Sequence, residues 1–294
     1  MQGVVKMKLH FMKYRKVAYI VSGALILLSL LSLLVRGLNY GIDFSGGISM
    51  EVTPVQESYT IDRMRADLSE FNPELQQVDG KAILIRLGLP KGATDEQQNE
   101  RVAQIKNILG ENVEYSQVQI VGPKIGGELV RGGILAILFA FVMMAIYVWI
   151  RYRGGYAVGA FVSLFLDFVL MFGFFSVTGL EFNQTAIAVI LTGIGYSIND
   201  KIVNYDRIDE NVKKYHKMPM ADLIDLSVNE MLRRTMLTSV STLLAMIGLS
   251  LFGGQLLREF AYAMGFSVIM GTFTSIYISN IMLYHFNLRD SDVK

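Results

Sequence analysis

The sequence predicts an α-helical polytopic membrane protein with six transmembrane helices and one α+β ferredoxin-like domain outside the bilayer. Three observations support this fold class. The 294 residues are 52% hydrophobic and have a mean hydropathy of +0.40, which is high for a soluble protein of this size. Six stretches are long and apolar enough to cross a bilayer. A polar segment, residues 37–131, separates the first two of them.

The first apolar stretch, residues 17–35, follows an N-terminal segment, residues 1–16, with five lysines and arginines and no acidic residue. Such a flank predicts a transmembrane helix whose N-terminus lies in the cytoplasm. A cleaved signal peptide is the alternative. The apolar run is long for a signal peptide and no small-residue cleavage site follows it, so we expect a retained helix.

The segment 37–131 has the pattern of a ferredoxin-like domain. Period-two alternation predicts strands at 48–54, 75–78, 82–87 and 115–121. Amphipathic helices are expected at 60–71 and 94–109. Thr60 can cap the first helix, Gly110 follows the second, and Asp79-Gly80 is a hairpin dipeptide. The order is βαββαβ, the split βαβ arrangement.

Five further apolar stretches follow the domain, at residues 132–150, 156–178, 182–203, 236–252 and 260–286. Six spans place both termini on one side, together with the short loop 151–155, the basic segment 213–234 of the loop 204–235, and the tail 287–294. The segment 37–131 carries more acidic than basic residues. The positive-inside rule therefore predicts cytoplasmic termini and an extracytoplasmic domain.

Several function classes are excluded by what the sequence contains. Cysteine is absent and the three histidines are far apart, so no cofactor or metal site is expected. Neither a nucleophile elbow nor an HExxH motif occurs, and basic and aromatic residues do not interleave as a nucleic-acid surface requires. The glycine-rich segment 41–47 lacks a Walker lysine and is typical of a turn. We therefore expect a protein that is not an enzyme.

Two carboxylates lie inside predicted spans. Asp167 is near the middle of the third span, and Asp200 is in the last turns of the fourth. A charge at bilayer depth costs ~2.5 kcal/mol or more, so such residues usually belong to an ion or substrate pathway. The alternatives are structural. Asp167 could be a neutral acid bonded to a neighbouring helix, and the fourth helix could end before Asp200.

Small and polar residues form one stripe on the fourth span. Spacings of three and four residues place them on a single helix face: Gly193, Ser197, Asp200, Asn204 and Arg207. A stripe of this kind serves close helix packing or lines a polar conduit. Packing alone would explain the glycine and the serine but not the aspartate.

The fifth span begins directly after Arg233 and Arg234, and Thr238 and Ser241 continue as a stripe suited to helix packing. Antiparallel neighbours would bring Asp200 and one arginine to similar depth, as a carboxylate–guanidinium pair. Forming or breaking this pair would change the protonation of Asp200. The alternative is that the arginines only set the topology.

Several motifs together make the chain resemble the SecD/SecF family of protein-export membrane proteins, which belongs with the RND-type transporters. The resemblance covers nearly the whole chain. It rests on GIDFSGG at 41–47, VGPKIGGEL at 121–129, Asp167, GYSINDKIVNYDRIDEN at 195–211, RRTMLTS at 233–239, and FGG, REF, MG, GT and SIYIS across 252–279.

The resemblance implies an RND-like half-transporter that uses the proton-motive force to promote late steps of protein translocation. It implies a proton pathway through Asp200 and Arg234, with Asp167 beside them. Asn199, Asp206 and Arg207 belong to the same motifs as supporting residues. The implied partners are SecD, the SecY/SecE/SecG channel, YajC and SecA as further candidates, the unfolded polypeptide in transit and the lipid bilayer, with no nucleic acid.

The chain departs from the family pattern after Asp200. Lys201 and Asn204-Tyr205 replace small, aliphatic and Phe residues, and Asp209 replaces an arginine. Lys201 points about 100° away from Asp200 around the helix, and we expect it to extend to the membrane interface. The coupling ion, H⁺ or Na⁺, stays open. So do two other functions, a small-molecule or lipid efflux half-transporter and a passive scaffold of a membrane complex.

Overall fold

The computed structural model describes residues 9–56, 58–78, 80–89, 94–152 and 154–286. Within these ranges the chain forms two compact units. A helical unit comprises residues 9–38, 137–180 and 185–286, and a sheet unit comprises residues 39–136 and 181–184. Three predicted features lie outside the described residues: the basic residues Lys6 and Lys8, the turn residue Asp79, and the tail 287–294.

Six helices of the described chain are long and apolar enough to cross a membrane, which confirms the predicted membrane fold. They are Phe11–Val35, Ile125–Arg151, Gly155–Thr178, Gln184–Lys214, Met220–Phe252 and Leu256–Tyr284. The chain is therefore a multi-pass membrane protein.

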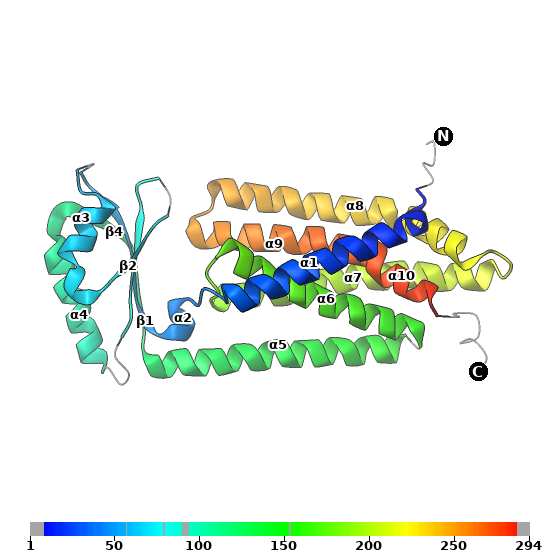
Figure 1. The fold of residues 1–294 in the computed structure, drawn as a ribbon, viewed down its shortest axis with the longest axis horizontal. Coiled ribbons are helices and arrows are strands. Elements are labelled where there is room, and N and C mark those ends of the chain that lie inside the picture. The colour runs from blue at the N-terminus through cyan, green and yellow to red at the C-terminus, as the bar shows by residue number, and fades with distance from the viewer. Residues whose placement is uncertain (1–8, 57, 79, 90–93, 153, 287–294) are drawn as a thin grey trace. The chain divides into compact units, whose positions relative to one another are not determined.

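The sheet unit has the predicted βαββαβ order. Its strands are β1 (Gly47–Pro54), β2 (Glu74–Gln77), β3 (Ile83–Leu87) and β4 (Val113–Val121), and they form an antiparallel sheet in the order β2-β3-β1-β4. Helices α3 (Ile61–Asp67) and α4 (Asp95–Leu109) cover one face of the sheet (Figure 1). This is the ferredoxin-like arrangement.

Alternation along β1 builds the core of the sheet unit. Ile48, Met50 and Val52 are fully buried because alternate residues of a strand point to the same face. They pack with residues from α3 and α4, including Met64 and Ile105. The apolar face of each element thus meets the others in one core.

Local signals explain where the helices of the sheet unit begin and end. Thr94 and Gln97 form a capping box at the start of α4, and Gly110 ends α4 with a positive φ of 52°. Helix α3 ends at Asp67, earlier than predicted, and is followed by the 3-10 turn η2 (Ser69–Phe71). Asn72 then adopts a left-handed conformation that stops the helix.

The helical unit contains α1 (Arg15–Val35) after the 3-10 turn η1 (Phe11–Tyr14), then α6 (Gly155–Thr178) and α8 (Met220–Phe252). It also contains α5 (Pro123–Arg151) from residue 137 onward and α7 (Gln184–Lys214) from residue 185 onward. Helix α9 (Gln255–Phe273) continues through a π-helical turn, η4 (Thr274–Ile278), into α10 (Ser279–Tyr284). The start of α1 and the end of α10 lie at the same end of this unit (Figure 1), and Tyr19 Oη lies 2.9 Å from His285 Nε2.

The segment 204–235, expected as a loop between spans, is helical except for residues 215–219. Helices α7 and α8 extend beyond their apolar parts because polar contacts join the extensions. Arg207 Nε donates to Glu230 (2.7 Å), and Asn211 Nδ2 donates to Ser227 Oγ (2.9 Å). Hydropathy therefore marked the end of the apolar stretch and not the end of the helix.

Candidate functional site

Asp167, near the middle of α6, is the centre of a buried polar cluster. Its side chain accepts hydrogen bonds from Ser197 Oγ of α7 (2.8 Å, to Oδ2) and from Thr274 Oγ1 of η4 (2.6 Å, to Oδ1). Lys201 Nζ lies 2.8 Å from Asp167 Oδ2, and the two side chains are 0% and 5% exposed. Two segments, α7 and η4, thus bring three polar groups to one carboxylate on α6.

The predicted orientation of Lys201 was wrong. Its ammonium does not extend to the interface but lies inside the helical unit, where it also donates to Ser197 Oγ and to Thr274 Oγ1 (3.3 Å). The reason is its spacing of four residues from Ser197, which places both on the face of α7 that contacts Asp167. Burial of two charges is tolerated when they are paired and their remaining hydrogen-bonding groups are satisfied, as here.

Close approach of α9 and α7 makes this cluster possible. A Cβ atom on Gly271 would lie 2.9 Å from the Cβ of Ser197, so only glycine lets the helices approach this closely. Beyond it, Ser275 Oγ donates to the backbone oxygen of Ser197 (3.3 Å), and Asn204 Nδ2 donates to that of Ser275 (3.4 Å). The π-helical turn is therefore anchored on α7 and carries Thr274 to Asp167. Such turns are frequent at functional sites.

Asp200 is buried next to this cluster in sequence but is not part of its hydrogen bonds. It is 6% exposed, and its Oδ2 has no hydrogen-bond partner among the described residues. Arg234 is exposed, and the described residues include no ion pair between it and Asp200. Lys201 and Arg234 are the cations whose charges act on the Asp200 carboxylate. The expected carboxylate–guanidinium contact is replaced by the Asp167–Lys201 pair.

The other predicted residues of α7 divide into two groups. Gly193, Ser197 and Asn204 are buried on the same side of the helix, whereas Asn199 is exposed. Arg207 lies in the extension, where it donates to Glu210 (2.6 Å) as well as to Glu230. The sequence stripe is thus divided between the buried cluster and the extension.

Asp206 belongs to a separate contact at the end of α5. It accepts hydrogen bonds from Arg151 (2.6 Å) and from the hydroxyl of Tyr152 (2.8 Å). Burial and this hydrogen bond raise the pKa of Tyr152. Asp206 therefore holds α5 to α7 and does not reach Asp167 by any contact of the described residues.

Thr238 and Ser241 do not form the packing face of α8. Thr238 donates to the backbone oxygens of its own helix, and Ser241, which is exposed, does the same. In this part of α8, hydrogen bonds to other helices come from Ser239, whose Oγ lies 2.8 Å from Thr272 Oγ1, and from Thr242, which donates to Tyr196 Oη (3.1 Å). The residues of α8 that make these hydrogen bonds therefore each come one position after a residue of the predicted stripe.

Sequence reasoning missed two members of the buried cluster, Lys201 and Thr274. For Lys201 a signal existed, because it lies one helical turn after Ser197 on the same face. For Thr274 the signal was weaker, namely a run of hydroxyl residues in an otherwise apolar span. No three His, Cys, Asp or Glu side chains in the described part of the chain gather as metal ligands would.

Two protein families match this chain. The family "Protein export membrane protein SecD/SecF, C-terminal" matches residues 101–289, and the "SecD/SecF GG Motif" matches residues 31–57. The chain belongs to the SecD/SecF family.

Individual members of the SecD/SecF family are similar over nearly the full chain. Protein translocase subunit SecF of Rickettsia felis is 39% identical over 297 residues, covering 98% of this chain and 95% of the relative. SecF of Rickettsia bellii is 41% identical, covering 93% and 92%. The crystal structure of SecDF, a translocon-associated membrane protein from Thermus thermophilus, matches with a TM-score of 0.84 and 31% identity, over 96% of this chain but 39% of that one.

The GG motif of the SecD/SecF family has a local physical reason here. It includes Gly46 and Gly47, where the short helix α2 (Ile42–Ser45) passes into β1. Gly46 has a φ of 71°, which is strained for other residues. A Cβ on Gly47 would lie 2.6 Å from the backbone oxygen of Leu87 on β3. The motif thus lets the chain turn sharply and enter the sheet.

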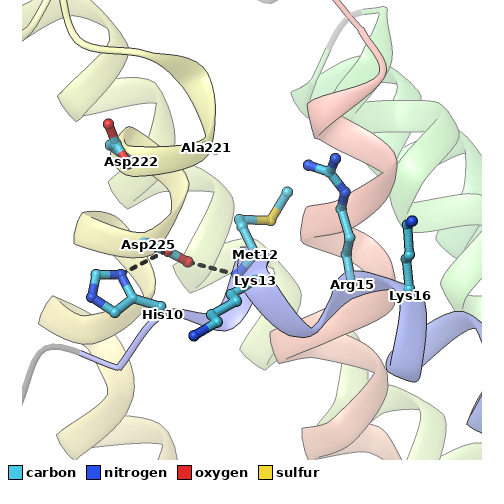
Figure 2. Close-up of a pocket in the computed structure, with 8 residues that line it drawn as sticks. All are labelled: His10, Met12, Lys13, Arg15, Lys16, Ala221, Asp222 and Asp225. Carbon is cyan, nitrogen blue, oxygen red and sulfur yellow. Dashed lines mark hydrogen bonds and ion pairs between the residues drawn. The ribbon is translucent and has the colours of Figure 1, made fainter.

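In this SecD/SecF chain, a second polar cluster joins the N-terminal turn η1 to α8 (Figure 2). Asp225 accepts a hydrogen bond from the backbone of Met12 (2.9 Å) and lies 3.7 Å from His10 Nδ1. Around them is a cleft of about 570 Å³ that is also lined by Lys13, Arg15, Lys16, Ala221 and Asp222. These contacts fasten the start of the first span to the extension of α8.

Proposed function

We propose that this chain is the SecF subunit of a Sec protein translocase, in which proton movement through the membrane-spanning helices promotes polypeptide export. The observation that carries this proposal is the buried Asp167–Lys201 pair with Asp200 as an additional buried carboxylate. Ionisable groups in membrane spans generally belong to ion pathways, and structural packing alone gives no reason to bury three of them.

Charge counting assigns different roles to the two carboxylates. Asp167 and Lys201 neutralise each other through direct contact. Among the described residues no cation contacts Asp200 in this way, so the three groups are together neutral only when Asp200 holds a proton. Because uncompensated charge at this depth is costly, we assign proton binding and release to Asp200. Arg234 would favour the ionised state if it approached Asp200, and it is our candidate for gating.

The energy available is sufficient for a conformational change. One proton that crosses ~150 mV releases ~3.5 kcal/mol, which is a substantial part of the ~5.5 kcal/mol needed to reverse a strongly biased two-state equilibrium. We propose that the change in charge at Asp200 shifts α7 against the π-helical turn at Thr274. The resulting movement of the sheet unit would hold the exported chain and prevent it from sliding back.

The proposed setting follows from the family and the charge distribution. Cytoplasmic termini and an extracytoplasmic sheet unit, in the cytoplasmic membrane, are supported by the basic residues around 151–155 and 213–234. SecD is the proposed six-span partner, since SecF relatives carry the name of a translocase subunit and the SecDF chain is more than twice as long. The SecY/SecE/SecG channel, SecA and YajC are proposed as further members of the assembly.

The test is protein export into inside-out membrane vesicles that contain the Asp200→Asn protein. We expect the stimulation of export by the membrane potential to be lost, while the amount of assembled complex stays normal. Asp209→Asn is the control, because Asp209 lies on the same helix and pairs with Lys213 at the surface. Unchanged potential dependence in Asp200→Asn would refute the proposal, and a loss of export matched by a loss of complex would favour a passive scaffold.

A further inference from the structure

We propose that Lys201 is a built-in cation that occupies an oxygen-lined site and thereby excludes Na⁺ from this chain. If the proposed function is right, exclusion of Na⁺ means that export is coupled to H⁺, so this consequence rests on the proposed function. That Lys201 occupies the site is independent of the proposed function and can be tested on the purified protein.

The groups around the Lys201 ammonium are those that a small hard cation requires. Nζ is contacted by Asp167 Oδ2 (2.8 Å), Thr274 Oγ1 (3.3 Å) and Ser197 Oγ. Carboxylate and hydroxyl oxygens are hard ligands, and they suit hard cations that are bound without sulfur or nitrogen donors. These oxygens come from α6, α7 and η4, so the tertiary structure assembles the set.

Hydrogen bonding in the site is complete only with an ammonium present. Lysine has three N–H donors, and three oxygens accept them. The two hydroxyls in turn donate their own protons to the two oxygens of Asp167. Without Lys201 the hydroxyl lone pairs and the Asp167 charge would face an unfilled space.

Charge makes the occupancy exclusive. Asp167 is 5% exposed and needs one positive charge to compensate it. Lys201 supplies that charge through a covalent tether, so no concentration of external cation is required. A Na⁺ ion beside the ammonium would meet strong repulsion in this low-dielectric surrounding. The other charged groups that act nearby, Asp200 and the exposed Arg234, do not contact the site.

The experiment measures thermal unfolding of the purified full-length protein in NaCl, KCl and choline chloride at equal ionic strength. The natural protein should unfold at the same temperature in all three salts. Lys201→Ser should gain a Na⁺-specific rise of roughly 5–10 °C when Na⁺ is about 100-fold above its dissociation constant. The double variant Lys201→Ser/Asp167→Asn should lose that rise, because the charge that attracts Na⁺ is gone. Lys217→Ser, at an exposed lysine, is the matched control.

Two results would overturn the inference: a Na⁺-specific rise in the natural protein, or a Lys201→Ser protein that responds equally to all three salts. Should Lys201→Ser not fold, Lys201→Gln is measured in the same way, because it keeps a hydrogen-bond donor but removes the charge. The natural protein's response remains decisive in either case. Since this measurement involves no export, its failure is distinct from failure of the Asp200→Asn test.

Discussion

The six membrane-spanning segments differ in how much of their apolar surface the chain itself covers. Within the most apolar stretch of each, 61% of residues are buried in α6, 50% in α7 and 61% in the segment from α9 to α10. The corresponding shares are 17% in α1, 6% in α5 and 11% in α8. Three spans thus form an interior, and three present apolar side chains outward to lipid or to a partner.

The buried spans are not the most apolar ones. The two lowest mean hydropathies, 1.3 for α7 and 1.5 for the segment from α9 to α10, belong to the buried group, whereas α5 has 2.6 and is the most exposed. Lipid is as apolar as a leucine side chain, so hydrophobicity gives no reason to bury a helix in a membrane. Polar and small residues do, because they need partners and allow close approach. The helices that carry the polar residues of the candidate site are therefore also the helices that are buried in the helical unit.

The largest expected difference between buried and exposed spans comes from removing one charge from the buried spans. Lys201→Met should destabilise the protein by about 3–5 kcal/mol in buffers without Na⁺, because Asp167 would be left buried and unpaired. Chemical unfolding of the purified protein measures this. The double variant Lys201→Met/Asp167→Leu should recover most of the loss. Lys213→Met, which breaks a surface pair, should cost less than about 1 kcal/mol.

Equal losses from the buried and the surface pair would contradict the view that α6, α7 and η4 form a tightly desolvated interior.

A smaller effect is expected from adding one methyl group to an inner or an outer glycine. Gly271→Ala should cost about 1–3 kcal/mol, because its Cβ would press on Ser197. Gly248→Ala on α8 should be neutral or stabilising by roughly 0.5–1 kcal/mol, since no heavy atom outside its own helix lies within 4 Å of the added Cβ. Melting temperatures of the two variants provide the comparison, and the reverse order would show that α8, not α9, packs closely.

The smallest effect concerns Tyr152, at the end of α5. Its pKa is raised above 10.0 by burial and by the hydrogen bond to Asp206. The unfolded chain therefore releases this proton at a lower pH than the folded protein does, so this contribution to stability is complete below pH 10 and is lost at higher pH. Tyr152→Phe should flatten the fall in melting temperature above about pH 10. An unchanged dependence of the melting temperature on pH would show that Tyr152 does not contribute to stability in this way.

Much of the fold and part of the site could be predicted from local patterns. Hydropathy located six spans, and alternation of residues such as Ile48, Met50 and Val52 located the sheet. Asp167 and Asp200 were recognisable because a carboxylate in an apolar span is costly wherever it points. The pairing was not predictable, since Asp167 and Lys201 are 34 residues apart, and Thr274 is 107 residues from Asp167.

By itself, therefore, the sequence determined the number of spans, the βαββαβ domain and the presence of charges that need an explanation. These properties depend on composition and on periodicity within one element. Only the tertiary structure decided that Lys201, and not an arginine, meets a membrane carboxylate, and which spans enclose the pair. It also decided that Asp200 Oδ2 has no hydrogen-bond partner among the described residues. The physical reason is that partner choice depends on which helix faces approach each other, and close contacts such as that of Gly271 with Ser197 decide this.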